Sequence, residues 1–113
     1  MIVTSPRLQQ LKDALRVLAS GAEAQINWLN EEMPVCVDEL ALEYDAIAVA
    51  ADLMFGVGEL DEDQRNRVEE LNSILSKMSG KENAHLWTTD ALRTAQEWRY
   101  VRTFAGECLK QLA

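Results

Sequence analysis

The chain has 113 residues, of which 48 % are hydrophobic and 27 % charged, and its formal net charge at pH 7 is −8. This length and composition are typical of one globular domain and argue against disorder, so residues 1–113 are expected to form a single domain. The acidic balance disfavours direct binding to nucleic acids and anionic membranes, because Lys and Arg supply most contacts to phosphate.

The first predicted helix covers residues 6–30. Ser5 is suited to the N-cap, and Pro6 would occupy the first helical position, where its missing N–H costs nothing. Apolar residues then recur at spacings of three and four, at Leu8, Leu11, Leu15, Leu18, Ala22, Ile26 and Leu29. Gly21 falls inside this pattern, and the sequence leaves open whether the helix bends or divides there.

The second predicted helix covers residues 37–55. Its main apolar seam consists of Val37, Leu40, Tyr44, Ile47, Ala51 and Met54. Most of its remaining surface is also apolar, which predicts a helix in the middle of a bundle. Asp38, Asp45 and Asp52 are the exceptions, and because they lie seven residues apart, we expect one solvent-exposed ridge.

The third and fourth predicted helices cover residues 62–79 and 95–112. Asp61 with Gln64 is typical of a capping box that opens the third helix, and Thr94 with Glu97 predicts another for the fourth. On the last helix, the spacing places Trp98 in the core and Tyr100 at the surface.

These patterns predict an all-α fold, an antiparallel bundle of about four principal helices over residues 6–30, 37–55, 62–79 and 95–112. The connections are expected to be short, because the chain contains only five Gly and two Pro.

The residues indicate no catalytic, metal or cofactor site, and we expect a non-enzymatic protein. Glu82 and His85 have the spacing of one half of a di-iron motif, but the chain has no second His. Cys36 and Cys108 are too few for a disulfide framework and are expected to be buried thiols. No signal peptide or segment long enough to cross a bilayer is evident, which predicts a cytoplasmic protein.

The strongest functional signal is a run of carboxylates without compensating charge. No Lys, Arg or His occurs between Arg16 and Arg65, whereas twelve acidic residues do. They are Glu23, Glu31, Glu32, Asp38, Glu39, Glu43, Asp45, Asp52, Glu59, Asp61, Glu62 and Asp63. Such self-repulsion within a folded chain favours a basic protein partner.

The leading hypothesis is therefore an inhibitor of the bacterial immunity or antitoxin type, which neutralises a basic protein through an acidic helical face. The predicted partner-binding residues are Glu31, Glu32, Asp38, Glu39, Glu43, Asp45 and Asp52. A structural or regulatory subunit that forms a homodimeric bundle is one alternative, with the acidity serving solubility. A DNA mimic that presents carboxylates in place of phosphates is another.

Overall fold

A computed structural model describes residues 5–31 and 36–112 of the chain. Within these ranges there are seven α-helices, one 3-10 helix and no β-strand. In chain order they are α1 (Pro6–Ala19), α2 (Ala22–Glu31), α3 (Asp38–Ala48), α4 (Ala51–Gly56), α5 (Glu62–Lys77), the 3-10 helix η1 (Lys81–Leu86), α6 (Thr89–Thr94) and α7 (Gln96–Leu112).

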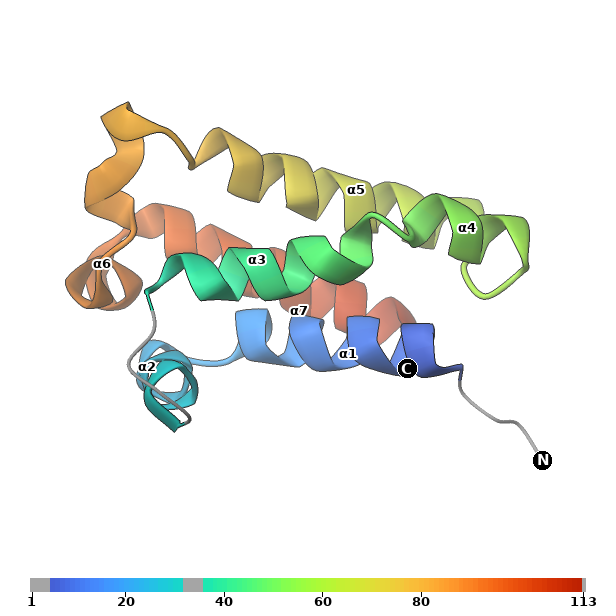
Figure 1. Ribbon diagram of the computed structural model, residues 1–113, viewed down its shortest axis with the longest axis horizontal. Helices are drawn as coiled ribbons and strands as arrows, with labels where there is room; N and C mark the ends of the chain where they lie inside the picture. Colours follow the sequence, from blue (N-terminus) through green and yellow to red (C-terminus); the bar gives the residue numbers. More distant parts are fainter. Residues whose placement is uncertain (1–4, 32–35, 113) are drawn as a thin grey trace.

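Four long segments run back and forth along the length of the molecule (Figure 1). Helix α1 is followed by α3 with α4 in the opposite direction, then by α5, and finally by α7. Helix α1 contacts α3 and α7, and α5 contacts the same two helices, which closes the bundle. The predicted all-α antiparallel bundle is thereby confirmed.

The core of the bundle is formed by one apolar face of each long helix. Trp98 of α7 and Tyr44 of α3 are its largest fully buried side chains. The Trp98 indole donates a hydrogen bond of 2.6 Å to the Leu86 carbonyl, and the Tyr44 hydroxyl donates one of 2.7 Å to the Val68 carbonyl. Burial also raises the pKa of Tyr44, so its phenol stays protonated and available as a donor.

Two of the predicted helix starts are confirmed and one is wrong. The Ser5 side chain accepts the Leu8 N–H, and Asp61 forms the complete capping box at the start of α5. Thr94 does not cap the last helix. It ends α6, where its hydroxyl donates to the Asp90 carbonyl at 2.9 Å, because residues 89–94 form a separate short helix.

The first predicted helix divides at Ser20, whose extended backbone (ψ 156°) ends α1. The last carbonyls of α1 therefore lack the N–H groups that a continuing helix would offer them. The side chain of Gln25 donates hydrogen bonds to two of these carbonyls instead. Its amide donates to the carbonyls of Val17 at 3.2 Å and Leu18 at 3.1 Å. Gln25 is fully buried, so this hydrogen bonding fixes the position of α2 against the end of α1.

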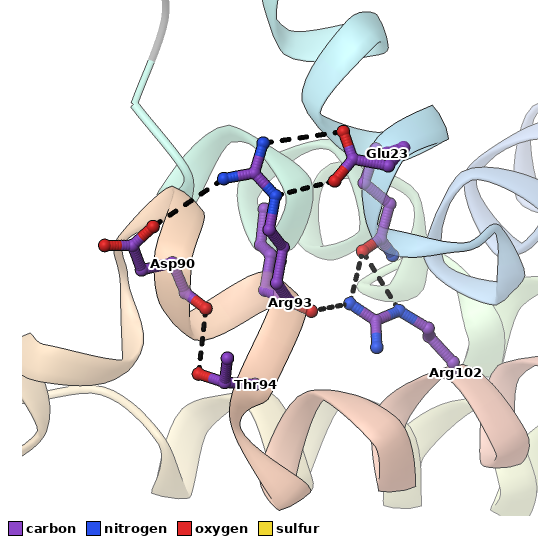
Figure 2. A network of polar contacts seen from close by, with 7 residues as sticks. Glu23, Asp90, Arg93, Thr94 and Arg102 are labelled. Atoms are coloured by element: carbon purple, nitrogen blue, oxygen red, sulfur yellow. Dashed lines mark hydrogen bonds and ion pairs between the residues drawn. The ribbon is translucent and has the colours of Figure 1, made fainter.

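A polar network joins α2, α6 and α7 at one end of the bundle (Figure 2). The Arg102 guanidinium donates to the Gln25 side-chain oxygen at 3.1 and 3.2 Å and also to the Leu92 carbonyl. Arg93 of α6 binds Glu23 of α2 with an N–O distance of 2.6 Å. The two short helices thereby cover the end of the core.

The second predicted helix also divides, at Val49 and Ala50. Ala50 has φ −87° and ψ 1°, and its N–H bonds the Ile47 carbonyl three residues back rather than four. No Gly or Pro marks this position in the sequence. After the turn, α4 packs against α5.

Gln25→Leu should remove the bridge between α1, α2 and α7 while keeping the volume of the side chain nearly unchanged. We expect the free energy of unfolding to fall by about 2–3 kcal/mol, since the half-buried Arg102 and the carbonyls of Val17 and Leu18 each lose hydrogen bonds to Gln25. Urea unfolding measures this, with the exposed Gln10→Leu as the control. Equal stability of the two variants would contradict a structural role for the network.

Glu59 should make the fold sensitive to acid. The Ser5 hydroxyl donates to its carboxylate, and Arg7 binds it at 2.5 Å; together they lower its pKa below the ordinary value of 4.5. The folded state therefore keeps Glu59 ionised to a lower pH than the unfolded chain does. Its contribution is complete above about pH 4.5 and is lost as the pH falls through the folded-state pKa.

We accordingly expect Glu59→Gln to lose less stability than the wild type between pH 6 and pH 3, measured by thermal unfolding across that range. The exposed Glu82→Gln should follow the wild type. Parallel curves for wild type and Glu59→Gln would contradict the assignment.

Candidate protein-binding surface

Helix α3 has apolar residues on two opposite faces. Its inner face buries Leu40, Tyr44 and Ile47. Leu42 on its outer face is 54 % exposed, and Val49 at its C-terminal end is 72 % exposed. The prediction that this helix lies in the middle of the bundle is therefore wrong, because only one of its apolar faces is covered.

Acidic residues border the exposed apolar residues of α3 on both sides. Asp38 and Asp45 lie four residues before and three after Leu42, which places both along the same flank of an α-helix. Both are exposed, so this part of the predicted ridge does reach solvent. Glu39 lies three residues before Leu42, on the opposite flank, and the exposed Glu43 follows it on that side.

No basic side chain neutralises these carboxylates in the described part of the chain. Asp38, Glu39, Glu43 and Asp45 have no Lys, Arg or His nitrogen within ion-pair distance there. Asp52 differs, since Arg65 of α5 lies 3.6 Å from its carboxylate.

A second carboxylate, Glu69 of α5, lies beside Asp52, and this neighbour raises the pKa of Glu69. The negative surface of α3 and α4 therefore extends onto α5. No spacing in the sequence joins residues 52 and 69, so only the packing of α4 against α5 reveals the pair.

The structure brings together most of the predicted partner-binding residues but does not describe all of them. Asp38, Glu39, Glu43 and Asp45 share the outer surface of α3, and Asp52 follows on α4. Glu31 is the last residue of α2. Glu32 and the side chain of Glu31 lie outside the described part of the structure.

Two adjoining hollows lie between α3 and the segment formed by the C-terminal part of α5 and the residues that follow it. One, of about 250 Å³, is lined by Ala41, Leu42 and Asp45 of α3 together with Leu75 and other residues of α5. The other, of about 260 Å³, shares Ala41 and Leu42 and reaches Asp38 and Trp87. We call the two together the α3–α5 groove. Its lining contains apolar residues and also the carboxylates of Asp38 and Asp45.

Two larger hollows lie between α5 and α7, and both include Tyr100, which is 55 % exposed as predicted. They have volumes of about 470 and 510 Å³. Charged residues of both signs line them, among them Lys77, Arg67 and Glu70. This α5–α7 groove thus lacks the uniform charge of the α3 surface.

The reactive side chains do not form a common centre. Cys36 is exposed, so its predicted burial is wrong, whereas Cys108 is buried as predicted. Burial raises the pKa of the Cys108 thiol to about 11. His85 is exposed on η1. Among the side chains that the structure describes, no three His, Cys, Asp or Glu residues gather as a metal site would require.

Comparisons with known proteins give no relative: no protein-family model, curated protein or solved structure matches the chain. In residues 5–31 and 36–112, no helix is both long enough and apolar enough to cross a membrane.

Sequence reasoning found the carboxylates of this surface but missed its apolar part. The seam from Val37 to Met54 already supplies one complete buried face. Leu42, Val49 and Leu53 lie outside that seam. Apolar residues beyond one buried face indicate either a central helix or an exposed apolar patch. The patterns of the other helices could not decide between the two, since the choice depends on how the helices are arranged.

Proposed function

We propose that this chain is a non-enzymatic protein-interaction module of the immunity or antitoxin type, which neutralises a basic protein partner through the outer surface of α3. The observation that carries the proposal is the exposed apolar pair Leu42 and Val49 between flanks of uncompensated carboxylates. An apolar centre with a charged rim is the usual arrangement of a protein–protein interface. A partner with Lys and Arg around an apolar patch would cover the apolar centre and pair with the carboxylates around it.

Charge favours a basic partner over a second copy of the chain. In a two-fold dimer the same surface patch meets itself, so this face would place Asp38 and Asp45 near the acidic residues of the other copy. A basic partner gains attraction instead, and opposite charge can raise association rates about tenfold to a thousandfold.

The exposed apolar residues also weigh against a DNA mimic. A mimic of the phosphate backbone needs regularly placed negative charge in a polar setting. Leu42 and Val49 interrupt the carboxylates of α3 with apolar surface, which the phosphate backbone does not offer.

The test is a pull-down from a lysate of the source organism at low salt, eluted with increasing salt and analysed by mass spectrometry. We expect one basic protein, released only at high salt. Asp38→Lys with Asp45→Lys should weaken its binding at least about tenfold, since both charges of one flank are reversed. Thermal stability should change little, because both side chains are exposed.

Glu70→Lys with Glu97→Lys is the matched control, because it makes the same change in net charge beside the α5–α7 groove. This variant should retain the partner. Equal retention by both double variants would contradict binding through α3, and loss only in the control would move the interface to the α5–α7 groove. A self-complex, detected by sedimentation as twice 12.7 kDa, would favour the homodimer instead.

A further inference from the structure

The outer surface of α3 repeats every seven residues. Asp38 and Asp45 form one row, and Leu42 and Val49 form the row beside it. At a rise of 1.5 Å per residue, the two members of each row lie about 10.5 Å apart along the helix. A second helix packed alongside would present its own residues at the same seven-residue interval.

The α3–α5 groove lies along the aspartate side of this surface. Leu42 borders both of its hollows, with Asp45 in one and Asp38 in the other. Each hollow, at about 250 or 260 Å³, can take a large apolar side chain, since a cavity of about 150 Å³ already holds a benzene-sized group. The groove therefore offers two places for apolar side chains, each beside a carboxylate.

We infer that the partner element bound here is an amphipathic helix, whose apolar residues enter the α3–α5 groove and contact Leu42 and Val49 while its Lys or Arg residues pair with Asp38 and Asp45. This inference rests on the proposed function and specifies the partner's chemistry: apolar residues seven apart, with a basic residue three or four positions from each. Helices of this kind bind grooves through residues on one face.

The charges that neighbour the groove determine which sign of charge the partner helix must carry. Asp38, Asp45, Glu39 and Glu43 surround the apolar row on α3, and the side of the groove formed by α5 contributes Asn72 and Ser76 rather than a basic residue. An acidic helix would meet like charge along the α3 side. A neutral apolar helix would leave these carboxylates partly desolvated without a counter-charge, which is costly.

The probe is a helical peptide of about three heptads, with Leu at one position of each heptad and Lys at the flanking positions. A matched peptide replaces every Leu with Ser and keeps every Lys. Binding is measured by fluorescence anisotropy at low and at physiological salt. We expect the Leu–Lys peptide to bind at least about tenfold more tightly than the Ser–Lys peptide.

Variants of the protein locate the contact. Leu42→Ser with Val49→Ser should weaken binding of the Leu–Lys peptide about tenfold, since two apolar contacts are lost. Tyr100→Ser removes an equally exposed apolar side chain from the α5–α7 groove and should leave the affinity unchanged. Circular dichroism checks that all variants remain helical.

The possible results separate this inference from the proposed function. If both peptides bind equally, and Asp38→Lys with Asp45→Lys abolishes binding, the acidic surface stands but docking of an apolar helix face is overturned. Absence of any binding by the Leu–Lys peptide also overturns the docking inference, while the pull-down decides the proposed function independently. Loss of affinity in Tyr100→Ser alone would place the helix in the other groove.

Discussion

Each helix of this bundle can bury one face, and α3 carries apolar residues on two. Leu40, Tyr44 and Ile47 complete its contact with the core, which leaves Leu42 and Val49 at the surface. Exposure of these two side chains gives up the free energy that their burial would contribute, at about 25 cal/mol for each Å² of apolar surface. A partner that covers them would recover this free energy, which would contribute to the proposed association.

The distribution of the basic residues supports the same interpretation. Three arginines join separate elements of the fold: Arg102 binds Gln25, Arg93 binds Glu23, and Arg7 binds Glu59. These contacts attach α2 and α6 to one end of the bundle and α1 to the segment after α4. These three cations hold elements of the fold together, and within the described structure no cation pairs with the four carboxylates of α3. The local excess of negative charge on α3 lies beside the exposed Leu42 and Val49.

The sequence allowed the fold class to be predicted because its signals are local. The caps at Ser5 and Asp61 and the three-four spacing of apolar residues define the long helices. The sequence leaves open whether the first predicted helix divides, because the division at Ser20 is stabilised by the side chain of Gln25, which reaches back across Gly21 to the Val17 and Leu18 carbonyls.

The errors concern features that depend on packing between helices. No residue type marks the turn at Ala50, and Thr94 has the spacing of an N-cap although it ends the preceding helix. The carboxylates of the candidate surface could be found from composition, but the exposure of Leu42 and Val49 could not. Their exposure is decided by which face of α3 the other helices cover.

Site-specific photo-crosslinking tests the central claim most directly. A photoreactive residue placed at position 42, or at position 100 as the control, reports what contacts each surface in a lysate of the source organism. The account predicts adducts from position 42 to one protein segment that has apolar residues flanked by Lys or Arg, and no such adduct from position 100. Adducts from position 100 alone, or from position 42 to an acidic segment, would contradict it.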